Sequence, residues 1–313
     1  MTQPSDPPEI EEMLLTVGPS KGLWRSAFSR LLRRKSGVAG LIIIGFIILV
    51  AIFAPLIAPY SPTEDFIGEP NTTRRDPPCV HLFGCDEELP EHIMGLDGNA
   101  RDQFSRIVYG SRLSLSVGLS TVAIAFTVGS TLGAIAGYWG RWVDNIIMRV
   151  MDVILGFPAL LLAIGIVAAL GPGLRNTLLA IAIVSIPQYA RVMRASVLSV
   201  KEEEFVAASR ALGAGGWRIL MTRVVPNTLT PLVVIGTLGV ASAILDAAAF
   251  GFLGLGAQPP TAEWGSMLAA ERQQIFSAPH LVFFPGIAIM ITVLGFNLLG
   301  DGLRDALDPS LNE

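Results

Sequence analysis

The chain has 313 residues, of which 51% are hydrophobic and only 15% are charged, and its mean hydropathy is +0.57. Soluble domains carry about 25% charged residues, so this composition excludes an ordinary soluble protein and indicates one that lies in a membrane. The formal net charge of −4 says little, because the distribution of charge matters more than its sum in a membrane protein.

The N-terminal segment is polar and then basic. Its first twenty or so residues hold four prolines and several acids, which predicts a disordered tail. Residues 22–34 combine Leu23, Trp24 and Phe28 with four arginines at roughly helical spacing. This pattern is typical of an interfacial helix, and a plain basic flank of the first span explains it equally well.

Six apolar stretches are long enough to cross a bilayer, which takes about 20 helical residues. They cover residues 37–57, 113–138, 153–170, 174–190, 229–256 and 281–299. The first is too long for the apolar core of a cleavable signal sequence, and prolines follow it instead of a cleavage site. The sequence therefore predicts an all-α, polytopic membrane protein with six transmembrane helices.

The 22 Lys and Arg residues predict the orientation of these spans. Alternating spans place 15 of them on one side and 7 on the other, and the richer side is expected to be cytoplasmic. Both termini then face the cytoplasm. The predicted parts are a cytoplasmic N-terminal tail with the interfacial helix (1–36), the first transmembrane helix (37–57), an extracytoplasmic loop (58–112), a five-span core (113–309) and a C-terminal tail (310–313).

Residues 199–226 form the most informative segment, because they are charged and helix-forming between spans that carry almost no charge. Ser199 and Glu202 have the spacing of a capping box. Glu203 and Glu204 add negative charge at the positive end of the helix dipole. The pattern predicts a short cytoplasmic helix that begins here.

This helix is expected to end at Leu212, with Gly213 as a left-handed cap. Phe205, Ala208 and Leu212 then fall on one face. A second short helix is expected over 217–225, ended by the following proline. Such helices are too short to be stable alone in water, so the segment is interpreted as a docking surface for another protein. An amphipathic loop on the lipid surface is the alternative.

The segment resembles the cytoplasmic coupling motif of binding-protein-dependent ABC importer permeases, E-A-A-x3-G-x9-I-x-L-P. Gly213 and Pro226 keep the 13-residue spacing of the motif, and Ala208 matches its first alanine. The departures are Ala207 at the glutamate, Ser209 at the second alanine, and Arg223 and Val225 at the aliphatic pair. Because the motif glutamate is missing, Glu204 is the candidate for the charged contact. The coupling residues implied by the resemblance are Glu204, Phe205, Ala207, Ala208, Ser209, Arg210, Leu212, Gly213 and Pro226.

Three further motifs resemble the peptide, nickel and glutathione branch of this family, and within it the C-type permease of a heterodimeric pair. They are 84–112 (ending LDGNARDQFSRIVYGSR), 250–267 (FGFLGLGAQPPTAEWGSM) and 297–309 (NLLGDGLRDALDP). The resemblance covers about 37–309 and implies a MetI-like fold. The implied partners are a homologous permease, two ABC ATPase subunits, an extracytoplasmic substrate-binding protein and the lipid bilayer of a bacterial or archaeal cytoplasmic membrane, with no nucleic acid.

The expected cargo is a short peptide, with nickel, glutathione or another small solute as alternatives. The chain has no G-x-x-x-x-G-K-[ST] phosphate loop and no nucleophile or metalloprotease motif. It is therefore expected to be a non-catalytic permease without a cofactor, while ATP and Mg belong to the ATPase subunits. An ion-coupled secondary transporter and a membrane scaffold without transport are the competing functional classes.

The chain's two cysteines, Cys79 and Cys85, lie in the predicted external loop. Disulfides persist outside the cytoplasm, so a Cys79–Cys85 bridge that stiffens the loop is predicted. A metal site formed by Cys79, His81, Cys85 and His92 is the alternative, although their spacing matches no standard metal-binding pattern.

Asp246 is the one acid deep inside a predicted span. A charge near mid-membrane costs about 2.5–3.5 kcal/mol on insertion scales, so Asp246 is expected to face a cavity or a partner. A role in the substrate pathway, for example with the amino terminus of a peptide, is one hypothesis. A structural hydrogen bond to the second permease, or a span shifted toward water, is the other. Asp152 is expected to complement a helix N-terminus and Arg149, and Pro158 and Pro187 are expected to kink their helices.

Overall fold

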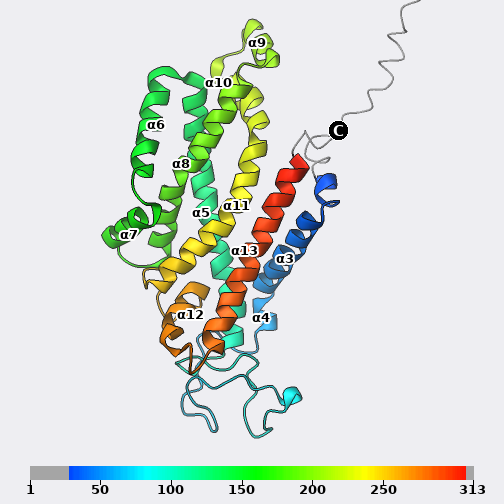
Figure 1. Cartoon of the computed structure of the whole chain (residues 1–313), viewed down its shortest axis with the longest axis vertical. Helices are drawn as coiled ribbons and strands as arrows, with labels where there is room; N and C mark the ends of the chain where they lie inside the picture. The colour runs from blue at the N-terminus through cyan, green and yellow to red at the C-terminus, as the bar shows by residue number, and fades with distance from the viewer. Residues whose placement is uncertain (1–27, 308–313) are drawn as a thin grey trace, which may run out of the picture.

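The computed structural model describes residues 28–307, and the regular secondary structure of this part of the chain is helical, with two isolated β-bridges in the loops. Five of its helices are long and apolar enough to cross a membrane. They are α3 (Lys35–Ile52), α5 (Gln103–Trp139), α8 (Leu174–Val200), α11 (Val225–Phe252) and α13 (His280–Leu307). Figure 1 shows these helices running side by side along the longest axis of the molecule.

The third predicted span is not a single helix. It consists of α6 (Arg141–Leu155) and α7 (Ala159–Leu170), which are bent by 90° at a break of three residues. Pro158 lies at the break, immediately before α7. Because a proline ring disfavours helical backbone in the preceding residue, a helix commonly ends there. The kink expected at Pro158 is confirmed, whereas α8 continues through Pro187.

Small residues allow two pairs of helices, α5 with α8 and α3 with α13, to pack closely along their length. On α5, Gly129, Gly133 and Gly137 meet α8, and an added Cβ at Gly133 would lie only 2.2 Å from the carbonyl oxygen of Ala190. The first span packs on the last in the same way, since Gly40 of α3 lies against the backbone of α13. Glycine at these positions lets the helix backbones approach closely, as small residues do in membrane proteins.

The loop end of the molecule contains the 58–102 connection and two short elements before α13. The short helix α4 (Ala54–Ile57) precedes this connection, which includes the 3-10 turn η1 (His81–Phe83). Helix α12 (Trp264–Glu271), followed by η3 (Arg272–Gln274), was not predicted. The predicted loop boundary at 112 lies inside α5, which begins at Gln103 because the Asp102 carboxylate accepts the N–H of Ser105 and caps the helix.

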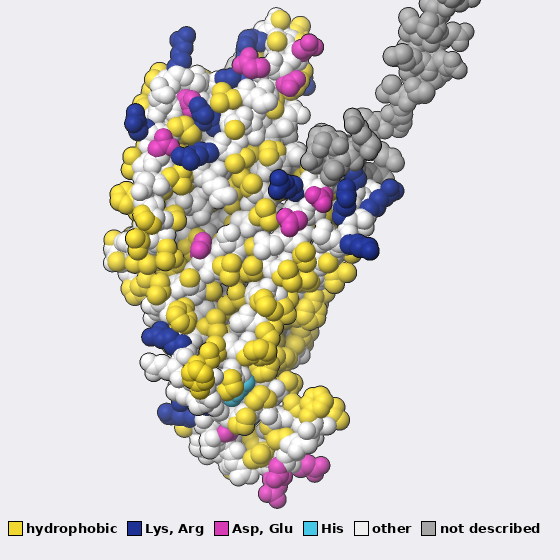
Figure 2. Space-filling model, viewed as in Figure 1, with side chains coloured by type: hydrophobic (Ala, Val, Ile, Leu, Met, Phe, Trp, Pro, Cys, Tyr) yellow, Lys and Arg dark blue, Asp and Glu magenta, His cyan; other side chains and the backbone are white. Residues whose placement is uncertain are grey.

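The opposite end, called here the α9 end, contains the described chain termini and two short helices, α9 (Glu204–Ala211) and α10 (Gly216–Ile219). Figure 2 shows hydrophobic side chains over the middle of the molecule and charged ones gathered toward its ends. The first twenty or so residues, the start of the predicted interfacial helix (22–27) and the 310–313 tail lie outside the described residues. Residues 28–34 of the interfacial segment are described, and 28–31 form one helical turn.

Candidate functional site

The segment around α9 begins differently from the prediction. Ser199 lies inside α8, which continues to Val200, so Ser199 cannot act as an N-cap and the predicted capping box is wrong. Helix α9 begins at Glu204, after Glu203 in an extended conformation, and no side chain caps it. The fourth span is therefore longer than its apolar stretch, because the polar residues after 190 continue the helix beyond the bilayer-length segment.

The end of α9 agrees with the sequence pattern. Gly213 has φ +80, and its N–H donates to the carbonyl of Arg210 at 3.0 Å. The N–H of Ala214 donates to the carbonyl of Ser209 at 3.2 Å. A left-handed residue at this point satisfies carbonyls at the helix end, and glycine adopts it at no steric cost.

The second predicted short helix does not end at Pro226. α10 passes into a π-helical turn, η2 (Leu220–Val224), and then into α11, so that 216–252 is one helical stretch. Pro226 lies in the first turn of α11, where its missing N–H costs little. The wider π turn directly before it carries the chain from the α9 end into the fifth span without a break.

Helix α9 is held against the molecule by one side chain that the sequence analysis missed. Val206 is 0% exposed and packs with Ile219, Leu220 and Val224 in a cluster that also contains residues of α8 and α11. Val206 and Phe205 are the two large apolar residues of α9. Which of them is buried depends on how α9 packs against the neighbouring helices, and the local sequence does not determine this.

The predicted coupling residues lie on the outside of this segment. Phe205 is 42% exposed and Leu212 88% exposed, and Glu204, Ala207, Ala208 and Arg210 are exposed as well. Ser209 and Leu212 border an open hollow of about 360 Å³ whose other wall is formed by residues of α10 and η2. Glu204 forms no hydrogen bond or ion pair with any residue of the described chain. The arrangement leaves an apolar and charged surface on a short, fixed helix.

Two ion pairs join α6 to α8 below this surface. Arg194 donates to both carboxylate oxygens of Asp144, at 2.5 and 2.6 Å. Arg191 donates to Asp152 at 2.6 Å. The expectation that Asp152 complements a helix N-terminus beside Arg149 is wrong, because Asp152 lies in the last turn of α6 and its partner is on α8.

Asp246 borders two adjoining hollows between the spans. The larger, of about 250 Å³, lies between α7, α8 and α11, and the smaller, of about 100 Å³, lies between α5, α8 and α11. Both are lined by Ser185 and Gln188 of α8 and by Ser242 and Asp246 of α11. Asp246 is exposed on the surface of this chain. The structure thus groups it with three polar side chains that the sequence analysis did not connect to it.

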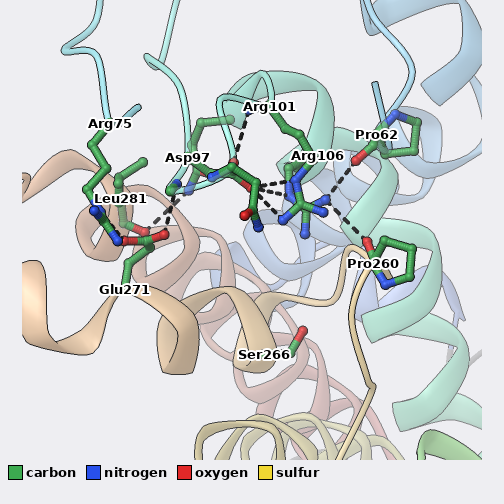
Figure 3. A network of polar contacts seen from close by, with 12 residues as sticks. Pro62, Arg75, Asp97, Arg101, Arg106, Pro260, Ser266, Glu271 and Leu281 are labelled. Atoms are coloured by element: carbon green, nitrogen blue, oxygen red, sulfur yellow. Dashed lines mark hydrogen bonds and ion pairs between the residues drawn. The ribbon is translucent and has the colours of Figure 1, made fainter. Parts of the chain in front are cut away.

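A network of ion pairs fixes the loop end (Figure 3). Arg75 donates to Glu271 of α12 at 2.8 Å, and the second oxygen of Glu271 accepts the N–H of Gly98 at 2.9 Å. Asp97 lies between Arg101 and Arg106, which approach it to 2.9 and 3.3 Å.

The same network reaches both connecting loops. Arg106 also donates to the carbonyls of Pro62 and Pro260, so one guanidinium links the 58–102 connection to the loop before α12. Glu263 caps α12 by accepting the N–H groups of Gly265 and Ser266, both at 2.8 Å. Burial raises the pKa of the Glu263 carboxyl, and these donors oppose that effect. These contacts join segments at the loop end that lie far apart along the chain.

Cys79 and Cys85 form a disulfide with a Cα–Cα distance of 5.4 Å. The four side chains of the alternative metal site do not converge. The two sulfurs form the disulfide with each other. The His81 ring contacts the carbonyl of Leu89, and the His92 ring contacts the carboxylate of Asp102 at 3.0 Å. Burial and the nearby Asp102 raise the pKa of the Tyr60 hydroxyl, which lies beside this pair. The disulfide therefore stiffens the connection beside a buried aromatic and polar cluster.

Two protein families match parts of this chain. Residues 129–313 match the family described as binding-protein-dependent transport system inner membrane component. Residues 22–78 match the family described as N-terminal TM domain of oligopeptide transport permease C. Together the two matches cover most of the chain, and the first covers α8, α9 and α11 entirely.

Several curated proteins are similar along nearly their whole length. The dipeptide transport system permease protein DppC of Alkalihalophilus pseudofirmus is 50% identical over 99% of this chain and 95% of that protein. The di/tripeptide permease protein DppC of Pseudomonas aeruginosa is 45% identical over 97% and 96%. The glutathione permease protein GsiD of Pectobacterium atrosepticum is 41% identical over 92% and 91%.

Among solved structures, a chain of the inward-facing MetNI methionine ABC transporter matches with a TM-score of 0.53 at 18% identity, covering 66% of this chain and 97% of that one. This match confirms the MetI-like helical fold. With the family matches and the full-length relatives, it shows that the chain belongs to the family of inner-membrane permease components of binding-protein-dependent ABC transport systems.

Proposed function

We propose that this chain and a homologous permease form the pathway by which an ATP-driven importer moves short peptides into the cytoplasm. The similar proteins named for dipeptides and di/tripeptides support this cargo. Those named for glutathione, itself a modified tripeptide, favour it as the second candidate. Both cargoes carry a free ammonium group and backbone amides, so the same pathway chemistry serves either.

The observation that carries the proposal is the geometry of α9. Val206 fixes this short helix to a cluster shared with α8 and α11, while Phe205 and Leu212 remain exposed. Exposed apolar side chains on a rigid helix fit a groove on a partner protein. We assign this surface to the ATPase subunits, which hold ATP and Mg, while the permease itself is not an enzyme.

The same geometry provides a route for the ATPase motion. A displacement of α9 is transmitted through Val206 to Leu220 and Val224, and from them into α11, because the helix is continuous from 216 to 252. Helices α8 and α11 border the hollows that contain Asp246. Movement at the α9 end therefore changes the shape of the pathway between the spans.

The orientation follows from the distribution of Lys and Arg. We place the α9 end and both termini in the cytoplasm and the loop end outside. The 58–102 connection and α12, which the Arg75–Glu271 and Arg106 contacts hold together, then form the surface on which an extracytoplasmic binding protein docks and delivers its cargo.

The test is gentle purification of the tagged full-length chain from its native membrane. An ATPase subunit and a second permease are expected to co-purify. Phe205→Asp with Leu212→Asp is expected to remove the ATPase and leave the second permease, because both side chains are exposed. A chain that purifies alone, or peptide uptake that follows the proton gradient and not ATP, would contradict the proposal and favour a scaffold or a secondary transporter.

A further inference from the structure

The four polar residues that border both hollows form one group, called here the polar cradle: Ser185, Gln188, Ser242 and Asp246. Ser185 and Gln188 are three residues apart on α8, and Ser242 and Asp246 are four apart on α11. Those spacings place each pair on one face of its helix. Asp246 lies six residues before the end of α11 at Phe252, so the cradle lies toward the loop end of the spans.

Most hydrogen-bond donors and acceptors of the polar cradle have no partner in the described part of the chain. In the described part of the chain, neither Asp246 nor Gln188 nor Ser242 forms a hydrogen bond or an ion pair, and the Ser185 hydroxyl donates only to the Ile181 carbonyl of its own helix. The other two acids on the nearby helices, Asp144 and Asp152, are each paired with an arginine of α8. Asp246 therefore differs from them in having no cation supplied by this chain.

The walls of the two hollows contain no Lys, Arg or His. Asp246 belongs to a membrane-spanning helix but is exposed on the surface of this chain, and acids in such helices usually face a water-filled cavity or a partner group. A cation that pairs with it would have to come from outside the chain. An arginine or lysine of the second permease would need only the carboxylate. Gln188 and the two serines add amide and hydroxyl groups around the same space, and these complement a peptide backbone, not a lone basic side chain.

The remaining wall of the larger hollow, of about 250 Å³, is apolar and includes Leu155, Leu160 and Phe250. This combination of one carboxylate, a few neutral polar groups and apolar surface is typical of small-molecule sites. We infer that the polar cradle binds the amino-terminal end of a peptide in transit, with Asp246 on the ammonium group and Gln188 on the first backbone amide. The inference rests on the proposed peptide cargo.

The test uses the complete importer in proteoliposomes, with its binding protein, ATP and radiolabelled dialanine as the probe. Asp246→Asn removes the charge with little change in shape, and is expected to reduce dialanine uptake at least tenfold. Asp246→Glu restores the charge and is expected to keep uptake within about threefold of wild type. Gln188→Leu is expected to give an intermediate loss. Asp301→Asn on α13, exposed near the α9 end, is the matched control and is expected to have no effect.

Two further measurements separate a pathway role from a structural one. In the Asp246→Asn importer, co-purification of the second permease and ATPase stimulation by the loaded binding protein are expected to stay within twofold, so fewer peptides move per ATP hydrolysed. Loss of the second permease would overturn the inference, because Asp246 would then pair with that subunit. Unchanged uptake would overturn it as well. A wild-type importer that takes up no peptide would refute the proposed cargo, and the cradle inference would fall with it.

Discussion

At the residue scale, the positions that matter most are those where one side chain, or its absence, decides a contact between distant segments. Gly133 on α5 and Glu271 on α12 are two such positions. Gly133 determines how closely α5 and α8 approach each other. Glu271 joins the 58–102 connection to α12. Each leads to a prediction that a matched substitution can check.

Gly133→Ala is expected to destabilise the protein by about 1–3 kcal/mol, the usual range for overpacking. The new methyl group would meet the Ala190 carbonyl at 2.2 Å and the Met193 Cβ at 2.9 Å, and backbone cannot move aside as a flexible side chain can. The measurement is the thermal unfolding midpoint in detergent. Gly45→Ala on α3, where nothing lies within 4 Å, is the control, and an equal midpoint for both variants would contradict the prediction.

Glu271→Ala is expected to loosen the 58–102 connection. Both of its oxygens are used, so the substitution leaves the Gly98 N–H and the Arg75 side chain without an acceptor. Both donors are only partly buried, so water can replace part of the lost interaction, and the expected cost is about 1 kcal/mol. Tryptic cleavage after Arg74 should become several-fold faster. Glu87→Ala, at an exposed position of the same connection, should cleave at the wild-type rate. Equal rates for both variants would show that the network does not order the connection.

At the element scale, α9 is a short helix with one buried side chain, Val206. Val206→Ala removes two methyl groups from a fully buried position, which is expected to cost about 2 kcal/mol of local stability. Hydrogen exchange in 204–211 should become faster by one order of magnitude or more. Val150→Ala on the exposed face of α6 is the matched control. An unchanged exchange rate in α9 would mean that another contact holds it.

The elements also show what the sequence could predict. Hydropathy located the five long apolar helices, and the glycine at 213 located the end of α9, because length, apolar content and a left-handed glycine are local properties. The 90° break before α7, the π turn before Pro226 and helix α12 depend on how neighbouring segments pack. The same holds for Val206 as the anchor of α9 and for Arg191 as the partner of Asp152, 39 residues away along the chain. Asp246 could be singled out from the sequence, but its neighbours Gln188 and Ser185 could not.

At the scale of the whole molecule, the charged ends and the apolar middle indicate the axis along which the molecule crosses the membrane, and the proposed orientation says which end faces the cytoplasm. Single cysteines can test it, because Cys79 and Cys85 are bonded to each other and do not react with maleimides. Glu87→Cys is expected to be labelled in intact cells by a membrane-impermeant maleimide. Glu202→Cys, in the turn before α9, should be labelled only after permeabilisation. The reverse pattern would invert the proposed orientation.

The contacts of Glu271 also determine when, during synthesis of the chain, the 58–102 connection can reach its final structure. Arg75 and Gly98 precede Glu271 by 196 and 173 residues, so the ribosome must add most of the spans before this carboxylate exists. At about 5–20 residues per second, the delay is roughly 10–40 s. During this interval the 58–102 segment has left the ribosome without the acceptor that later fixes it. Nascent chains halted before residue 271 should therefore be cut readily at Arg74, and protection should appear only when α12 has been synthesised.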